Sequence, residues 1–215
     1  MKITIIGFGY IGAVIGATFS KMGHKVIALD SNEKVINDLN LGICNIPEPQ
    51  LNELISQQVK NGNLRGSHDY KEVSNSEVVL VTVGTPLSEN FDADLDAISK
   101  VFSQLSKNIV DNQIIMLKST VPPGVTRQMY DTFFVDKKNV YVGFSPERLA
   151  EGNALKELNE LPIIVGGVDE ESTKKCSEFW ETTLGVDVIR MSSCESAELV
   201  KLANNQWIDL NIALA

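Results

Sequence analysis

The chain has 215 residues, of which 43% are apolar and 22% charged, and its formal net charge is −9. A chain of this length and composition can bury a substantial core, so a disordered protein is excluded and one domain with an extension is expected. The acidic balance, without any run of Lys and Arg, also excludes a general nucleic-acid surface, which needs clustered cations.

Short apolar runs alternate with amphipathic stretches along the chain. The runs predict strands buried on both faces at residues 3–6, 26–29, 78–83, 114–117, 140–142, 163–165 and 186–189. The stretches predict helices at residues 11–22, 33–39, 49–60, 95–106, 124–134 and 170–183. This repeated order predicts an α/β fold with a doubly wound parallel sheet and right-handed crossovers.

The last segment follows a different pattern. Residues 194–215 have helical periodicity with neither Gly nor Pro, so the chain is expected to end inside a long helix. We therefore divide the chain into a domain at residues 1–190 and the beginning of a long connecting helix at residues 191–215. The apolar run at residues 3–19 imitates a leader or a membrane span, but the strand, turn and helix predicted there explain its glycines.

Residues 7–12 read Gly-Phe-Gly-Tyr-Ile-Gly, directly after the first predicted strand and at the start of the first helix. Such a turn is typical of Rossmann-type dinucleotide-binding domains. In them Gly7 allows the tight turn, Gly9 lets the backbone approach a pyrophosphate, and Gly12 allows the helix to pack closely on the strand. The free amides at the helix start, at Tyr10 and Ile11, would then face the phosphates.

Asp30 ends the second predicted strand, at the distance along the chain where a carboxylate binds the adenine ribose. A carboxylate repels a 2′-phosphate, so NAD is predicted rather than NADP. The alternative is a simple glycine turn followed by a solvated Asp30. No paired metal-ligand spacing is found, and no metal is expected.

Two further strand ends carry polar loops, Val-Gly-Thr-Pro at residues 83–86 and Lys-Ser-Thr-Val-Pro-Pro-Gly-Val-Thr at residues 118–126. Both are expected at the carboxyl edge of the sheet, where open α/β sheets bind ligands. Taken singly, each is equally explained as a turn or a helix cap.

Three more segments follow: Phe-Ser-Pro-Glu-Arg-Leu-Ala-Glu-Gly-Asn-Ala at 144–154, Leu-Pro-Ile-Ile-Val-Gly-Gly at 161–167 and Ala-Glu-Leu-Val-Lys-Leu-Ala-Asn-Asn at 197–205. In this order, together with the glycine turn and the two loops, they resemble the UDP-glucose/GDP-mannose dehydrogenase family over essentially the whole chain. Pro-Glu-Arg at 146–148, and Ile-Pro-Glu-Pro-Gln-Leu at 46–51, resemble its UDP-N-acetyl-D-mannosamine dehydrogenase branch.

The resemblance implies oxidation of the C6 alcohol of a UDP-sugar to a carboxylate with two NAD, through an aldehyde and a cysteine-bound thioester, for surface polysaccharide synthesis. It implies that Thr85 and Thr120 contact the nicotinamide side and that Thr120 orders a water molecule. Glu151 would assist acid/base steps or hold the cofactor.

By the same resemblance, Glu147, Arg148 and Leu149 would line the sugar-nucleotide site. Lys201 and Asn205 are four residues apart, so they lie on one face of the predicted helix. Lys201 could neutralise an oxyanion as hydride leaves, and Asn205 could donate to the same centre. From spacing alone, a solvated lysine and a polar helix asparagine explain the pair better; the resemblance reverses that preference.

The sequence departs from the family pattern in several ways. The 215 residues include neither the glycine-rich loop with a nucleophilic cysteine nor the C-terminal UDP-binding domain that the resemblance implies, and none of Cys44, Cys176 and Cys194 lies in such a loop. Ile208 stands where the N-acetylmannosamine branch often has Arg, and Val35 where many relatives have a basic residue. We expect NAD binding without complete oxidation by this chain, and reduced cysteines in the cytoplasm.

Three alternatives remain at this stage. UDP-glucose 6-dehydrogenase is the second enzyme of the same family, and a 3-hydroxyacid or 6-phosphogluconate dehydrogenase is a more distant one. The alternative outside enzymes is an NAD-binding interaction module, in which the helix at 194–215 pairs with a partner. A homodimer through this helix is expected, because its apolar face lacks a covering domain.

Overall fold

The computed structural model describes residues 1–88, 90, 92–136 and 139–215. The strands are β1 (Lys2–Ile6), β2 (Lys25–Leu29), β3 (Leu64–Ser67), β4 (Val78–Val81), β5 (Ile114–Leu117), β6 (Tyr141–Phe144), β7 (Ile163–Gly167) and β8 (Val188–Arg190). They form one sheet in the order β3-β2-β1-β4-β5-β6-β7-β8. The chain starts in the middle of this sheet and winds outward in both directions, so the predicted doubly wound α/β fold is confirmed.

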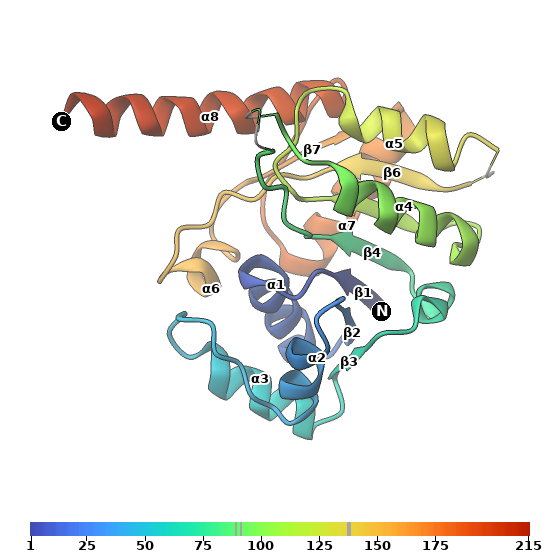
Figure 1. Cartoon of the computed structure of the whole chain (residues 1–215), viewed down its shortest axis with the longest axis vertical. Coiled ribbons are helices and arrows are strands. Elements are labelled where there is room, and N and C mark those ends of the chain that lie inside the picture. The colour runs from blue at the N-terminus through green and yellow to red at the C-terminus, as the bar shows by residue number, and fades with distance from the viewer. Residues whose placement is uncertain (89, 91, 137–138) are drawn as a thin grey trace.

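Helices cover both faces of the sheet (Figure 1). They are α1 (Tyr10–Lys21), α2 (Glu33–Asn40), α3 (Leu51–Lys60), α4 (Asp96–Asn108), α5 (Val125–Phe133), α6 (Ala154–Glu157), α7 (Glu170–Leu184) and α8 (Cys194–Leu214), with the 3-10 helix η1 (Tyr70–Asn75). One hydrophobic cluster joins the sheet to α1, α3, α6 and α7, and a second joins it to η1, α4, α5 and the start of α8.

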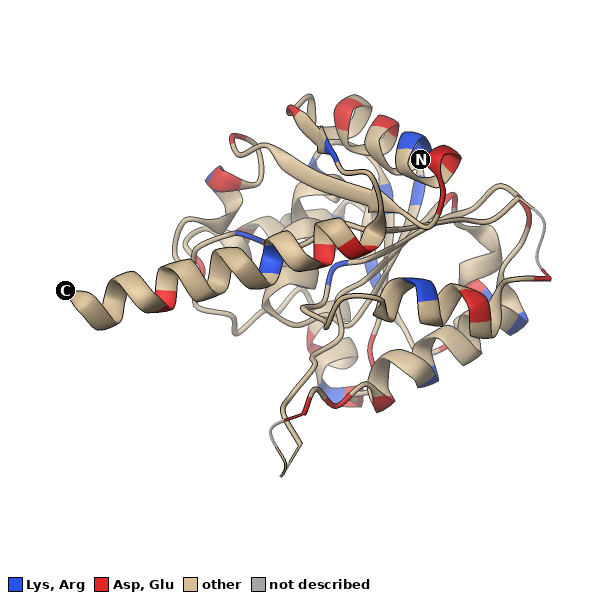
Figure 2. Ribbon diagram, turned by 90° about the horizontal axis from the view of Figure 1, so that it is seen from above, with Lys and Arg blue, Asp and Glu red and all other residues tan. Residues whose placement is uncertain are grey.

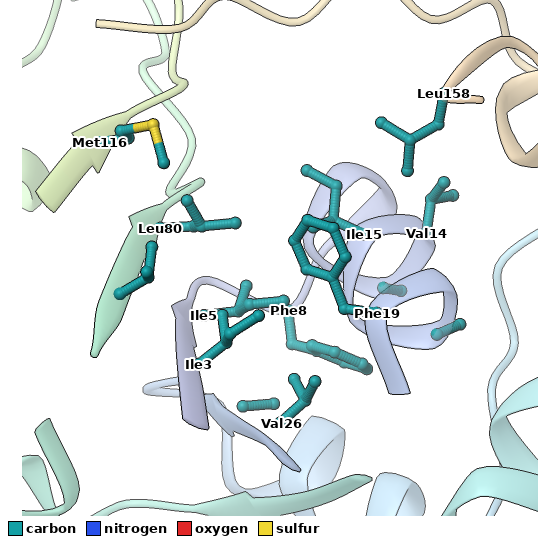
Figure 3. Close-up of a cluster of buried hydrophobic side chains, with 14 of the residues drawn as sticks. Ile3, Ile5, Phe8, Val14, Ile15, Phe19, Val26, Leu80, Met116 and Leu158 are labelled. Carbon is teal, nitrogen blue, oxygen red and sulfur yellow. The ribbon is translucent and has the colours of Figure 1, made fainter. Parts of the chain in front are cut away.

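Alternating side chains of each central strand enter the two clusters. In β4, Val78 and Leu80 belong to the first cluster, while Val79 and Val81 belong to the second. All four are buried, as expected for a strand covered on both faces. Between β1 and α1, the first cluster gathers Ile5 with the aromatic rings of Phe8 and Phe19 (Figure 3). Burying each such side chain contributes roughly 1.5–3 kcal/mol, which holds the first turn and helix firmly on the sheet.

The sheet is mostly parallel, as predicted, and departs from that pattern at one place, where β7 runs antiparallel to β6. To add a parallel neighbour, the chain must return from the carboxyl end of one strand to the end of the sheet where that strand began, usually through a full helix. The connecting residues 145–162 instead contain the single-turn helix α6. The two strands pair only at Gly143↔Gly167 and Phe144↔Gly166, and β8 then continues parallel to β7.

Three short elements were not predicted: β3, η1 and α6. Strand β3 reads Leu-Arg-Gly-Ser and buries only Leu64, because it pairs with β2 alone at the sheet edge. The long final helix was predicted, and α8 extends away from the body of the molecule toward the C-terminus (Figure 1). In the described part of the chain, no helix combines the length and the apolar character needed to cross a membrane.

Candidate functional site

The glycine turn between β1 and α1 is closed on one side and open on the other. Gly7 has φ +91°, and its amide donates to the carbonyl of Leu29 at 2.8 Å. A Cβ at Gly12 would lie 2.1 Å from the carbonyl oxygen of Gly7, so helix and turn pack too closely for a side chain. A Cβ at Gly9 would meet nothing within 4 Å, and Gly9 is exposed. The turn therefore presents bare backbone at Gly9.

The first turn of α1 is suited to binding an anion. Gly9 is its N-cap, no side chain caps the helix, and no acidic residue lies in its first turn among the described residues. The helical hydrogen bonds begin with the Ala13 amide donating to Gly9 at 2.9 Å, so the amides of Tyr10 and Ile11 precede that ladder. Such amides and the helix dipole together favour phosphate groups.

Asp30 directly follows β2, beside this turn. One carboxylate oxygen, Oδ2, accepts from the Phe8 amide at 2.7 Å, and the other, Oδ1, accepts from the Asn32 amide at 2.9 Å. Each carboxylate oxygen has a second lone pair, which leaves both able to accept from ribose hydroxyls. Asp30, Gly7 and Gly9 line one cavity of about 740 Å³, which also reaches Tyr70 and Gly84. The glycine cradle and its carboxylate thus fit a dinucleotide.

Thr82 fixes the glycine turn from the neighbouring strand, a role that sequence analysis missed. Its hydroxyl donates to the carbonyl of Gly7 at 2.6 Å. Residues 78–83 were predicted as one strand, but β4 ends at Val81 and Thr82 begins the following loop. A single threonine within the apolar run Val-Val-Leu-Val-Thr-Val at 78–83 was the available signal, but its partner is 75 residues earlier in the chain.

The two polar loops after β4 and β5 meet. The Thr85 hydroxyl donates to the carbonyl of Thr120 at 2.8 Å, and the Ser119 hydroxyl donates to the carbonyl of Val83 at 2.6 Å. Both Thr85 and Thr120 are half-buried. Because β1, β4 and β5 are parallel neighbours, these loops lie at the same carboxyl edge as the glycine turn.

The segment after β6 is held at this edge by two lysines. The Lys201 ammonium, on α8, donates to the carbonyl of Glu147 at 2.5 Å. Lys118, at the end of β5, is almost fully buried; its ammonium donates to the carbonyl of Ser145 at 3.0 Å and lies 3.4 Å from Glu147 Oε2. It also lies 4.8 Å from the ring centre of Trp180. Burial lowers the pKa of Lys118, and partial burial lowers that of Lys201, while Glu147 opposes both shifts.

The side chains predicted to line the sugar-nucleotide site first of all shape their own segment. Glu147 Oε1 accepts from the amides of Arg148 and Leu149, at 2.7 and 3.0 Å. The Arg148 guanidinium donates to the carbonyl of Pro162, just before β7. Leu149 packs against the first hydrophobic cluster. These contacts define the path of the chain from β6 to α6.

The structure brings the remaining predicted residues near the site without joining them. Lys201 and Asn205 are both half-buried, one helical turn apart on α8. Glu151 is exposed, and its charge acts on Tyr10 at the start of α1. Within the described residues, neither the Asn205 nor the Glu151 side chain makes a hydrogen bond. Among the predicted catalytic and substrate-binding residues on α8, Lys201 is therefore the one that the fold joins to the segment after β6.

Glu198 is a second residue that sequence analysis did not assign. It is fully buried on α8, and its carboxylate accepts from the Gly124 amide at 2.6 Å and from the Thr126 amide and hydroxyl at 2.8 and 2.6 Å. It thus caps the N-terminus of α5 from another helix. Because Glu198 precedes Lys201 by less than one turn, this cap sets the position of Lys201 relative to the loop that carries Thr120.

The three cysteines are unsuited to nucleophilic chemistry. Cys176 and Cys194 are buried and Cys44 is half-buried, and all three are free thiols. Burial raises the pKa of each, for Cys194 to about 12, so the reactive thiolate is disfavoured. Within the described residues, no group of three His, Cys, Asp or Glu side chains could hold a metal ion.

An open glycine turn, a carboxylate at the end of β2 and polar loops at one carboxyl edge together define a dinucleotide-binding α/β domain. Residues 1–184 match the UDP-glucose/GDP-mannose dehydrogenase family, NAD binding domain. The chain belongs to this family, and NAD is its cofactor.

The chain is similar over its whole length to a UDP-N-acetyl-D-mannosamine dehydrogenase of Methanococcus maripaludis, with 33% identity over 218 residues that make up 49% of that protein. A UDP-glucose 6-dehydrogenase of Rickettsia conorii is also 33% identical, over 99% of the chain and 50% of the relative. The chain thus spans about half the length of the curated relatives it matches.

The solved structure of the UDP-N-acetyl-D-mannosamine dehydrogenase of Pyrococcus horikoshii matches with a TM-score of 0.93 and 28% identity, covering 100% of this chain and 52% of that one. A 3-hydroxyisobutyrate dehydrogenase of Mycobacterium tuberculosis shares the fold alone, with a TM-score of 0.67 and 15% identity.

Proposed function

We propose that this chain is the NAD-binding part of an enzyme that oxidises the C6 alcohol of a UDP-sugar to the uronate. UDP-N-acetyl-D-mannosamine is the first candidate substrate and UDP-glucose the second. The observation that carries the proposal is the hydrogen bond of Lys201 to Glu147 at the carboxyl edge that also holds the glycine turn. A cationic side chain there faces the end of the sheet where the cofactor binds.

When bound, NAD supplies the hydride acceptor. Lys201 would neutralise the negative charge that develops on the sugar oxygen, and its lowered pKa makes a proton easier to move. Asn205, one turn further along α8, would donate to the same oxygen. Thr120 would order a water molecule for the second oxidation. Its carbonyl accepts a hydrogen bond from Thr85, whereas its hydroxyl makes no hydrogen bond with the described residues and can bind the water. Glu151 would exchange protons with that water.

We place the substrate sugar against residues 147–149, whose conformation Lys118, Lys201 and internal hydrogen bonds support. Two sequence features bear on the choice between the two sugars. Pro-Glu-Arg at 146–148 favours the N-acetylated sugar. Ile208, which is 47% exposed on α8, offers no cation to a phosphate where that branch often has Arg.

We further propose that residues 1–190 form the NAD-binding domain and residues 191–215 begin a connecting helix. Support comes from β8, which pairs with β7 and so belongs to the sheet up to Arg190. The nucleophilic cysteine and the UDP-binding domain would come from the half of the relatives' length that this chain does not span. Three free cysteines favour action in the cytoplasm.

The second half of α8 supports a homodimer. Trp207, Ile212 and Leu214 are 66%, 71% and 78% exposed, and Asp209 is the one charged residue between 202 and 215 (Figure 2). An exposed apolar face of this kind marks an interaction surface. It equally favours the alternative of an NAD-binding interaction module without catalysis. Gel filtration with and without NAD would test the dimer, and a monomer under both conditions would contradict it.

Calorimetry and NADH fluorescence test the catalytic proposal. We expect this chain to bind NAD more tightly than NADP and to form no steady NADH with either sugar. Joined to the remaining half of the Methanococcus maripaludis relative, it should form NADH with UDP-N-acetyl-D-mannosamine faster than with UDP-glucose. No heat at millimolar NAD would refute the cofactor assignment.

In that joined protein, Lys201→Met should abolish NADH formation while NAD binding persists. Lys156→Met is the matched control, because the Lys156 side chain is 72% exposed and its ion pair, with Glu160, lies on the surface. If Lys201→Met turned over as fast as the control, the role given to Lys201 would be wrong.

A further inference from the structure

Glu48 is a buried carboxylate that the proposed mechanism does not use. It lies in the loop before α3, is 7% exposed, and forms no salt bridge among the described residues. A carboxylate without a cation is costly to bury, so its hydrogen bonds must compensate. They come from Tyr10, whose hydroxyl donates to Oε2, and from the amides of Gly152 and Leu155, at 2.8 and 3.2 Å.

These donors belong to two segments with different proposed roles. Tyr10 follows Gly9 directly and is the first residue of α1, so it belongs to the turn that holds the cofactor. Gly152 follows Glu151 and lies three residues beyond Leu149, the last of the residues proposed to contact the sugar. The Gly152 amide also lies 3.2 Å from the Tyr10 hydroxyl, so Tyr10 and Glu48 share it. Glu48 therefore connects segments that are 142 residues apart in the chain.

The protonation states at neutral pH suit this connection. Burial alone would raise the pKa of Glu48, but the Tyr10 hydroxyl and the backbone amides of Leu155, Gly152 and Ala154 outweigh it and hold the pKa below its ordinary value. Burial and the bond to Glu48 raise the pKa of Tyr10 to about 12. An ionised carboxylate thus accepts from a protonated phenol, which makes a strong, charge-assisted hydrogen bond.

We propose that Glu48 is a positioning residue that couples the occupied glycine turn to the segment at 147–152. The proposal rests on the function proposed above. Phosphate groups against the Gly9 and Tyr10 backbone restrict Tyr10, and the Tyr10 hydroxyl then holds Glu48 and the Gly152 amide in place. Cofactor binding thereby orders the segment at 147–152, which includes Glu151.

Amide hydrogen exchange with and without NAD tests the coupling in the 215-residue chain. In the wild type, NAD should slow exchange at Gly152 and Leu155 by roughly fivefold or more, the lower end of typical coupling between sites. Tyr10→Phe removes only the connecting hydroxyl and leaves the Glu48 bonds to both amides. Compared with the wild type at NAD concentrations that saturate each protein, this variant should lose the NAD-dependent slowing at both amides.

Tyr141→Phe is the matched control, because Tyr141 begins β6, half-buried and away from the carboxyl edge. It should keep the full effect of NAD. Unchanged slowing in Tyr10→Phe, or NAD binding to the wild type without any change at Gly152, would overturn the coupling alone. A wild type that bound no NAD would overturn the proposed function and the coupling with it.

Discussion

Two alanine substitutions in the glycine turn should separate cofactor binding from folding. Gly9 has φ −77°, which alanine adopts freely, and its Cβ would meet nothing within 4 Å. Alanine is the poorer N-cap but loses less entropy on folding, so Gly9→Ala should change the free energy of unfolding by less than about 1 kcal/mol. Gly12→Ala places its Cβ 2.1 Å from Gly7 oxygen, more than 1 Å short of ordinary contact. Overpacking of this kind costs about 1–3 kcal/mol or more.

The effects on binding should not follow the effects on stability. At Gly9 the new methyl group occupies the space where the pyrophosphate approaches the backbone. NAD affinity should therefore fall at least about tenfold, or about 1.4 kcal/mol, in a variant that is as stable as the wild type. Gly12→Ala should lose stability even without NAD, because helix and turn must separate.

Thermal unfolding and calorimetry on the same samples measure both quantities. For a chain of this size, 1 kcal/mol shifts Tm by roughly 2–4 °C, so the two variants should be resolved clearly. A Gly9→Ala protein that bound NAD like the wild type would refute the placement of the pyrophosphate at this turn. A Gly12→Ala protein of wild-type stability would refute the packing argument.

Three other substitutions probe the neighbouring contacts. Asp30→Asn removes the charge that opposes a 2′-phosphate, so the ratio of NADP to NAD affinity should rise in calorimetry; an unchanged ratio would contradict the role of Asp30. Glu198→Ala leaves the two buried donors of Thr126 and the half-buried Gly124 amide without their acceptor. It should lower the free energy of unfolding by about 3 kcal/mol in urea titrations, against little change for the exposed Lys156→Ala. The Arg127 guanidinium lowers the pKa of Glu195 to about 2, below its unfolded value, so this pair stabilises the fold above about pH 5 and loses its effect as pH falls toward 2. The difference in unfolding free energy between wild type and Glu195→Gln should shrink over that range, and a constant difference would exclude the ion pair as its cause.

Local sequence was sufficient for the features that depend on residues near one another in the chain. The apolar runs at β1, β2, β4 and β5 marked strands buried on both faces, because such strands have no polar side to display. The glycine turn was readable because all three glycines and Asp30 fall within one strand–helix–strand unit. The periodicity of α8 likewise marked a helix without any knowledge of what it contacts.

Tertiary structure decided what depends on partners distant in sequence. The reversed β7 follows from the path of residues 145–162, which no pattern within β7 reveals. Strand β3 pairs with β2 alone, and this edge position tolerates polar side chains. Its sequence therefore lacks the apolar run that would have predicted a strand.

The same holds at the site. Thr82, Glu198 and Glu48 are ordinary polar residues in the sequence, and their roles arise from acceptors and donors on other elements. Sequence by itself therefore determined the fold class, the cofactor turn and the family resemblance, since these rest on short-range periodicity and spacing. Burial and hydrogen bonding between distant segments, which only the folded chain creates, decided which side chains hold that turn, α8 and the segment after β6 in place.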